Sequence, residues 1–249
     1  MTDSPVRLGS ILFTLVEPHR GFEVAYNRWY ERDHFYAGVL VGPHTLAGQR
    51  WVATRADKAL RHPVDLPGSY LGLYWIEAGH HDEWNRWGVD TVNQLHAQGR
   101  MFAERDHVHT ALYDFAWAYG RDPDGVPPEL ALDHRYRGLV ATLVEGPASD
   151  WYRDELLPEV APGLPVDQVL GFTPLPLLAD APTDVARQDD GAERLLLLWF
   201  LDADPGEAWA GGFADHGDRL AASGRGTLTW AAPFRPTVPG TDIYTDQLW

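Results

Sequence analysis

The residues best suited to chemistry gather in one short stretch, from Tyr26 to Trp51. His34 is the leading candidate, because an imidazole can take or give a proton near neutral pH. Tyr30 lies one helical turn earlier, so it can face His34 and orient the ring. Arg50 falls on a predicted strand, where its guanidinium would suit an anionic oxygen or an enolate. We predict these three as the catalytic residues; the alternative is that His34 sits in the core and bonds a backbone carbonyl.

Other side chains are of the types that wall a pocket for a flat apolar molecule. The predicted substrate-binding residues are Asn27, Trp29, Tyr36, His44, Trp51, Trp75, His96, His109 and Tyr113. Because side chains alternate along a strand, Arg50 and Trp51 point to opposite faces, and one of them should look into the fold. The alternative for this pair is a surface arginine and a tryptophan that faces a helix.

The histidines outside this stretch give a weaker indication of a functional site. Alternation places four side chains of one predicted strand on a single face: His107, His109, Tyr113 and Trp117. A His-x-His pair on a strand can chelate a metal, but no third ligand is marked by spacing, so we predict no metal site. His80 and His81 fall at the predicted start of a helix, where we expect them to be solvated.

Hydrophobic periodicity and turn residues predict the elements that carry these residues. The predicted strands cover residues 6–17, 45–55, 69–79, 107–119, 137–145, 167–178, 194–202 and 227–234. The predicted helices cover residues 21–39, 80–100, 147–159 and 205–223. Residues 56–67 and 179–191 are predicted to be polar connections, and residues 235–249 an extended tail.

These elements predict a tandem repeat. Residues 1–120 read β-α-β-β-α-β, residues 121–133 form a linker, and residues 134–249 repeat the order with a tail. Four local matches support the repeat: residues 14–17 with 142–145, Trp29-Tyr30 with Trp151-Tyr152, Trp75 and Trp84 with Trp199 and Trp209, and residues 95–100 with 220–225. Leu156 stands at the place of His34 in the second copy, so we predict an active first half and a degenerate second half.

The predicted fold class is α+β, because a β-α-β-β-α-β unit forms an antiparallel sheet with both helices on one face. We expect the two bare sheet faces to meet and enclose a central cavity. With Asn27, Trp29, Tyr30 and His34 in the pattern N-x-W-Y-x-x-x-H, the chain resembles the dimeric α/β-barrel (ferredoxin-like) superfamily, particularly its EthD-like branch. Relatives include cofactor-free monooxygenases acting on polyketides, polyketide cyclases, small-lactone isomerases and haem-binding enzymes, and fold analogy does not choose among them.

Composition excludes several functions. The net charge of −16 argues against nucleic acid and against anionic membrane surfaces. The chain has no cysteine, which excludes disulfides, thiolate metal sites and cysteine nucleophiles. No phosphate-binding loop, dinucleotide fingerprint or serine nucleophile elbow is present. The N-terminal residues lack the pattern of a signal peptide, so we expect a cytoplasmic location.

We predict a cofactor-independent enzyme that performs acid–base chemistry on a small hydrophobic molecule, aromatic or polyketide-like. The reaction would be a cyclisation, an isomerisation or a dehydration. One alternative is a cofactor-free monooxygenase acting on a similar substrate. The others are a non-catalytic protein that binds a small ligand or haem, and a scaffold whose barrel is filled by side chains. The fused chain could also pair as a homodimer.

Overall fold

A closed barrel of eight antiparallel strands dominates the computed structural model, which describes residues 6–146, 149–176, 178–180 and 193–249. The strands follow the order β1-β3-β2-β8-β5-β7-β6-β4 around the barrel. Their bounds are β1 Leu8–Pro18, β2 Thr45–Val52, β3 Tyr70–Glu77, β4 Arg105–Gly120, β5 Gly138–Glu145, β6 Val166–Leu175, β7 Arg194–Leu201 and β8 Thr227–Pro236. Each overlaps one predicted strand. The polar connection predicted for residues 179–191 lies almost wholly outside the described residues.

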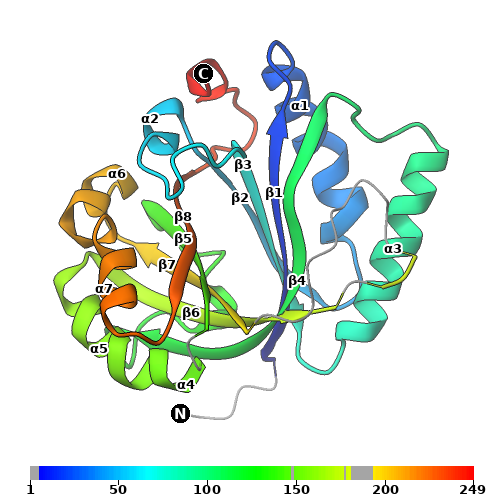
Figure 1. Cartoon of the computed structure of the whole chain (residues 1–249). Coiled ribbons are helices and arrows are strands. Elements are labelled where there is room, and N and C mark those ends of the chain that lie inside the picture. Colours follow the sequence, from blue (N-terminus) through cyan, green and yellow to red (C-terminus); the bar gives the residue numbers. More distant parts are fainter. Residues whose placement is uncertain (1–5, 147–148, 177, 181–192) are drawn as a thin grey trace.

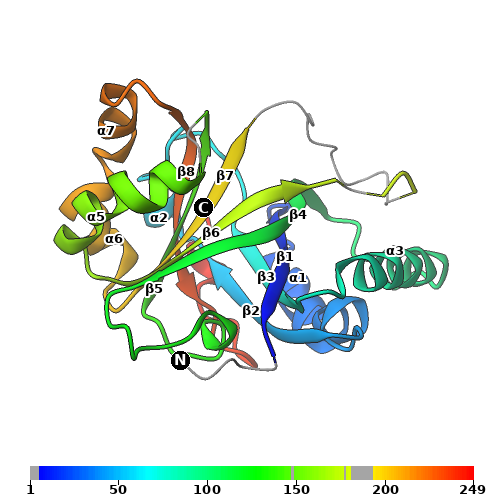
Figure 2. The ribbon, with the colours of Figure 1, turned by 90° about the horizontal axis from the view of Figure 1, so that it is seen from below.

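Helices cover the barrel in two groups on opposite sides, as Figures 1 and 2 show. One group holds α1 (Glu23–Trp29), the π-helical segment η1 (Tyr30–Leu40) and α3 (His81–Ala97). The other holds α4 (Ser149–Trp151), η3 (Tyr152–Leu156), α5 (Leu157–Val160), α6 (Pro205–Ala208), η5 (Trp209–Phe213) and α7 (His216–Ala222). The short helix α2 (Arg55–Lys58) occupies part of the predicted connection at 56–67. Among the described helices, none has the length and apolar composition needed to cross a bilayer.

The interior of the barrel is packed with large side chains. The inward-facing residues of all eight strands form one continuous core that includes Phe13, Trp51, Trp75, Phe172 and Phe200, each with no exposed surface. Interiors packed this way hold few voids larger than a water molecule. Among the described residues, aromatic and branched side chains of the inner faces meet across the barrel and fill the space where a central cavity was predicted.

The predicted linker packs against the barrel. Ala131 and Leu132 are buried in the barrel core. The indole Nε1 of Trp75 donates to the carbonyl oxygen of Pro128 at 2.9 Å, and the backbone N–H of Leu8 donates to Glu129 at 3.1 Å. These contacts fix a segment whose composition predicted a loose connection.

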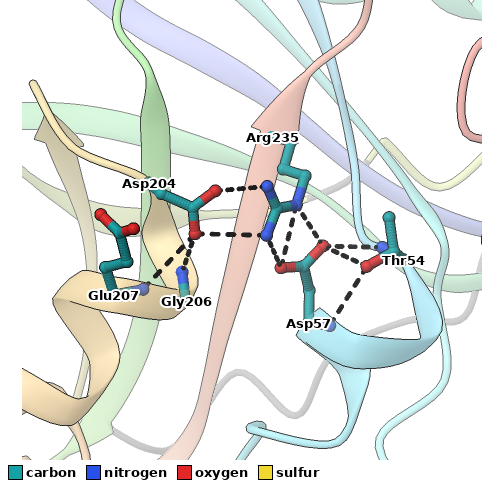
Figure 3. Close-up of polar contacts among 6 residues, drawn as sticks. All are labelled: Thr54, Asp57, Asp204, Gly206, Glu207 and Arg235. Carbon is teal, nitrogen blue, oxygen red and sulfur yellow. Dashed lines mark hydrogen bonds and ion pairs between the residues drawn. The ribbon is translucent and has the colours of Figure 1, made fainter.

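A charged cluster joins elements that are far apart in sequence (Figure 3). The Arg235 guanidinium, on β8, donates to both carboxylate oxygens of Asp57 on α2 and to Asp204 at the start of α6. Asp57 is only 1% exposed and also accepts from the backbone N–H and hydroxyl of Thr54. Burial alone would raise the pKa of Asp204, but its hydrogen bonds from Arg235 and Gly206 lower it. The cluster thus holds α2, α6 and β8 together.

The C-terminal residues pack onto α1. The Asn27 amide donates to the carbonyl oxygen of Thr241 at 2.9 Å, and Arg28 pairs with Asp242. The side chain of Leu248 is 1% exposed. The predicted extended tail is therefore an anchored segment that ends in a short 3₁₀ turn, η6 (Thr245–Gln247).

Irregular strand pairing separates residues that simple alternation places together. Leu15 pairs with His109 and Val16 pairs with His107, so β4 has one extra residue between them. A bulge of this kind changes the face on which the following side chains lie. His109 packs on Phe13 in the barrel interior, whereas His107 bonds to Thr110 on the outer face. The prediction that the two histidines share a face is wrong for this reason.

Two further predictions about the strand faces of tryptophans are wrong, because the strand register differs from simple alternation. A second shift in β4, after Phe115, sends Trp117 outward to pack with Tyr152. Trp75 lies in the barrel interior, but Trp199 belongs to the outer core beneath the second group of helices. Because a slip of one residue exchanges the faces of a strand, these two tryptophans are not equivalent positions.

Candidate active site

A cleft of about 120 Å³ lies outside the barrel, between the sheet and the first group of helices. Its floor comes from β1 and β4, and its walls from α1, η1 and α3. The lining is largely apolar; its polar side chains are Thr14, Tyr30, His34, Asn85, Arg105, His107 and Thr110. A dry cavity of about 150 Å³ can hold benzene. The enclosed part of this cleft therefore has room for about one aromatic ring.

His34 projects into this cleft from η1. Its ring stacks on the indole of Trp29, with centroids 4.7 Å apart and planes 16° from parallel, and contacts the edge of Tyr30 at 5.3 Å. A Cβ on Gly38 would come within 2.7 Å of the ring, so the glycine leaves the space that the imidazole needs. The wider turn of a π-helix, often found at functional sites, brings these residues around the ring.

The ring nitrogens of His34 are available to a bound molecule. Neither ring nitrogen makes a hydrogen bond with the described residues, and Nδ1 is buried without a partner. Burial, reinforced by the positive charge of Arg105, lowers the pKa of His34 to about 3. The ring is therefore neutral at physiological pH and offers a lone pair to a molecule in the cleft.

Arg105 supplies the positive charge of the cleft. Its guanidinium lies 5.4 Å from the centroid of the Trp29 indole, on which His34 also stacks. Its Nη2 is 3.3 Å from Nε2 of His107, and Nδ1 of His107 is 2.8 Å from the hydroxyl of Thr110. Since a guanidinium only donates, Nε2 of His107 accepts, and the neutral ring donates from Nδ1 to Thr110. Arg105 is thus held at the edge of the cleft by polar contacts.

The structure brings Tyr30, but not Arg50, to His34. Tyr30 lines the cleft, but its hydroxyl bonds to that of Tyr74, so it positions His34 through ring contact. Arg50 is buried under α1, donates to Asn27 Oδ1 at 2.9 Å, and lies 4.4 Å from the face of Tyr30. It borders a separate pocket of about 200 Å³.

The remaining predicted substrate-binding residues are dispersed. Trp29 backs the ring of His34, and Asn27 holds the C-terminal segment. Four lie in the barrel interior: Trp51, Trp75, His109 and Tyr113. Three lie elsewhere on the first half: Tyr36 beside Arg50, His44 before β2, and His96 exposed on α3. Only Tyr30, His34 and the supporting Trp29 belong to the cleft or its immediate wall.

Several polar residues of the cleft were missed from sequence. Arg105 and His107 fall at the start of β4, which begins two residues before the predicted strand, and the bulge hides the outward direction of His107. Asn85 is 6% exposed on α3 and makes no side-chain hydrogen bond with the described residues. Asn85 follows Trp84 on an amphipathic helix, and buried amides usually have hydrogen-bond partners. The sequence could therefore have indicated Asn85 as a candidate site residue.

Beneath the second group of helices, the region that corresponds to the cleft is filled, although a pocket of about 600 Å³ lies between these helices and is lined by Trp151, Leu156 and Arg219 among others. The Trp199 indole donates to Thr142 at 3.1 Å, and the hydroxyl of Tyr152 lies 2.7 Å from Nε2 of His216. These side chains pack with Leu156 into the core beneath the second group of helices. Burial lowers the pKa of His216 to about 4, so this histidine is neutral as well. It is enclosed, whereas His34 faces a cleft.

Haem does not fit the first cleft or the filled region of the second half, and the outer pocket of about 600 Å³ has no histidine, cysteine, methionine or tyrosine among the described residues of its lining to serve as an axial ligand. Pockets for ligands of drug size and larger span roughly 300–1,000 Å³, well above the 120 Å³ of the first cleft. In the second half, the imidazole Nε2 of His216, the natural axial donor there, contacts Tyr152 and is closed off by packing. No haem-dependent step is therefore derived for this chain.

Comparisons with known proteins show the fold and no more. No protein-family model matches the sequence, and no curated protein matches it. An anthrone oxidase-like protein aligns over 96% of this chain and 98% of its own, with 12% identity and a TM-score of 0.54. A candidate chlorite dismutase aligns over 98% and 100%, with 12% identity and a TM-score of 0.50. The chain has the dimeric α/β-barrel fold that these structures share.

Proposed function

We propose that the chain is a cofactor-independent enzyme in which His34 removes a proton from a small aromatic molecule bound in the cleft. The observation that carries the proposal is the neutral imidazole of His34, without a hydrogen-bond partner, at an apolar cleft with room for about one ring. A phenol, or a ketone whose neighbouring C–H is acidic, is the substrate class that this combination suits.

The chemistry starts with transfer of the substrate proton to His34. The electron pair left on the substrate becomes an enolate or phenolate, and Arg105 is the cation in the cleft that can stabilise the oxyanion. In the empty cleft His34 is a weak base, but an adjacent oxyanion favours its protonated form and raises its pKa. Proton transfer and oxyanion binding therefore reinforce each other. Arg105 therefore takes the role of stabilising the oxyanion, which the sequence had assigned to Arg50.

The later fate of the oxyanion decides the reaction. Return of the proton to a different atom gives an isomerisation, attack on a second carbonyl gives a cyclisation, and loss of hydroxide gives a dehydration. A carbanion that reacts with dioxygen gives the monooxygenase alternative. One structure with the same fold is described as anthrone oxidase-like, which motivates testing that branch.

We also propose that residues 1–120 and 134–249 are two copies of one ferredoxin-like unit of the EthD-like type. The support is the order of their main elements and the pairs Trp29-Tyr30 and Trp151-Tyr152, each of which leads into a π-helical turn. The first copy would carry the site, and the second, with its filled counterpart, would support it. Pairing of two chains as a homodimer stays a prediction.

Deuterium exchange tests the central step without knowledge of the natural substrate. Phenylacetone, a ketone with a single aromatic ring and acidic C–H groups, is incubated with the protein in D2O under argon and followed by proton NMR. The wild-type chain should accelerate exchange above buffer, and His34→Gln should slow the enzymatic rate by about 10²–10⁴-fold, the usual contribution of a positioned base. His134→Gln, at an exposed position outside the cleft, is the matched control and should leave the rate unchanged.

Two results would contradict the proposal. One is full exchange activity in a folded His34→Gln variant. The other is no acceleration by the wild-type chain with phenylacetone and a panel of related one-ring aromatic ketones. Consumption of dioxygen when the argon is replaced by air, with loss of the same signal in His34→Gln, would select the monooxygenase branch.

A further inference from the structure

A second group of titratable side chains lies outside the cleft, where the residues before β2, the end of β3 and the start of α3 meet. His44, Glu77 and His80 each present a ligand atom, and these atoms all lie within 4.8 Å of one another. Glu83, in the first turn of α3, adjoins both histidines. Across the described ranges, no other group of three such side chains has this spacing.

The backbone holds the three residues in place. The N–H of Glu77 donates to the carbonyl oxygen of His44 at 2.9 Å, and the N–H of His80 donates to that of Glu77 at 3.2 Å. His44 has a φ of 62°, in the left-handed region that residues other than glycine seldom adopt. Two segments that are distant in sequence, one with His44 and one with Glu77 and His80, are thus fixed with their side chains converging.

The side-chain arrangement is poorly explained by packing alone. The rings of His44 and His80 lie face to face, with centroids 3.4 Å apart and planes 8° from parallel. Aromatic rings prefer offset or edge-to-face contacts, and two protonated imidazoles would repel each other. Glu77 Oε2 is 2.9 Å from His44 Nδ1, and Glu83 Oε2 is 3.5 Å from a nitrogen of each ring. Glu83 meets His44 through the ring nitrogen that does not face Glu77, so the converging donors are His44, Glu77 and His80, a set that a cation would satisfy.

We propose that His44, Glu77 and His80 bind one divalent first-row transition-metal ion, represented by Zn²⁺, with solvent completing its coordination. Imidazole nitrogen together with carboxylate oxygen suits Zn²⁺ and its neighbours, whereas Mg²⁺ and Ca²⁺ prefer oxygen ligands alone. The side chains of His44, Glu77 and His80 are 30%, 27% and 38% exposed, so an ion can enter from solvent. The sequence marked none of these residues as a metal ligand.

The site would act on the cleft through α3. The ion ties the start of α3 to the neighbouring ends of β2 and β3. One turn into the helix, Trp84 lines the cleft, and its indole donates to the hydroxyl of Thr45 at 2.8 Å, the residue after His44. Bound metal would therefore stabilise one wall of the cleft, whatever reaction the cleft performs.

The test measures Zn²⁺ binding by the whole chain after treatment with a chelator. Titration against a chromophoric competitor should show one more bound equivalent in the wild type than in the double variant His44→Asn/His80→Asn. The single variant Glu77→Gln, which keeps the size of the side chain, should weaken the affinity at least tenfold. His96→Asn, on the same helix but outside the group, is the matched control and should bind as the wild type does.

Co²⁺ gives a second readout, because its visible absorption reports coordination by nitrogen and oxygen. The wild type should show this band, and Mg²⁺ in tenfold excess should not displace it. The double variant should lack the band, and Glu77→Gln should need at least tenfold more Co²⁺ to reach it. Far-UV circular dichroism checks that each variant is folded, and Glu77→Gln keeps the test valid if the double variant is not. Equal Zn²⁺ stoichiometry and affinity in the wild type and the folded variants would overturn the proposal.

Discussion

Acid should destabilise this protein through histidines that the fold keeps neutral. Burial lowers the pKa of His34 to about 3, and those of His109 and His216 to about 4, from an ordinary value of 6.5. In the unfolded chain these rings bind protons below pH 6.5, whereas in the folded chain they do not until the pH approaches the lowered pKa. The stability they contribute is therefore present above pH 6.5 and is lost as the pH falls toward 4.

The size of the effect follows from the displacement of each pKa. Between pH 7 and pH 5, a histidine with a folded pKa near 4 costs about 2 kcal/mol, at roughly 1.4 kcal/mol per pH unit below 6.5. Three such residues cost about 6 kcal/mol together, which is comparable with the whole stability of a typical domain, about 5–15 kcal/mol. We expect the free energy of unfolding to fall steeply over this range.

His109→Gln separates this effect from the titration of carboxylates. Nε2 of His109 lies 2.7 Å from the hydroxyl of Tyr113, and a glutamine amide can keep that contact without titrating. Urea unfolding, followed by tryptophan fluorescence at pH 7, 6 and 5, should show a loss smaller by about 2 kcal/mol in the variant. The exposed control His96→Gln should follow the wild type. Identical pH dependence in His109→Gln and the wild type would refute the reasoning.

Two other substitutions probe the cleft and the charged cluster. Gly38→Ala places a methyl group within 2.7 Å of the His34 ring, so the ring must move. We expect the rate of deuterium exchange into the ketone to fall at least tenfold, with little change in the thermal unfolding temperature. An unchanged exchange rate would contradict the placement of His34 in the cleft. Arg235→Met leaves the nearly buried carboxylate of Asp57 without its counter-charge and should lower the free energy of unfolding by about 3 kcal/mol. Arg153→Met, whose acidic neighbours are exposed, should change it by less than about 0.5 kcal/mol, and an equal loss in both variants would count against a specific role for the cluster.

The strands were predictable because long apolar or alternating runs end at glycine, proline and charged residues. All eight predicted strands overlap observed ones, and of the pair Arg50 and Trp51, Trp51 does face the interior. The filled barrel was not predictable, because the same inward aromatic residues could line a cavity or close it. Which it is depends on how facing side chains interdigitate across sheets that are far apart in sequence.

The site was only partly predictable. Tyr30 and His34 are four residues apart, so spacing alone places them on one helical face. Trp29 falls on the adjoining stripe, and the π-helical turn brings its indole against the His34 ring. His107 was predicted to share a face with His109, and the extra residue in β4 reverses its direction. Arg105 was missed because β4 begins two residues before the predicted strand. Arg50 was assigned to the site on residue type, but its place on the strand puts it beneath α1, with Asn27 and the face of Tyr30 as neighbours.

The location of a bound aromatic ring is the most direct test of the central claim. A crystal soaked with 4-bromophenol and measured at the bromine absorption edge would show where the ring binds. We predict the ring in the cleft between β1, β4, η1 and α3, with its hydroxyl within hydrogen-bond distance of Nε2 of His34, and no such signal in His34→Ala. Bromine inside the barrel, or in the pocket beside Arg50 with the cleft empty, would contradict the account.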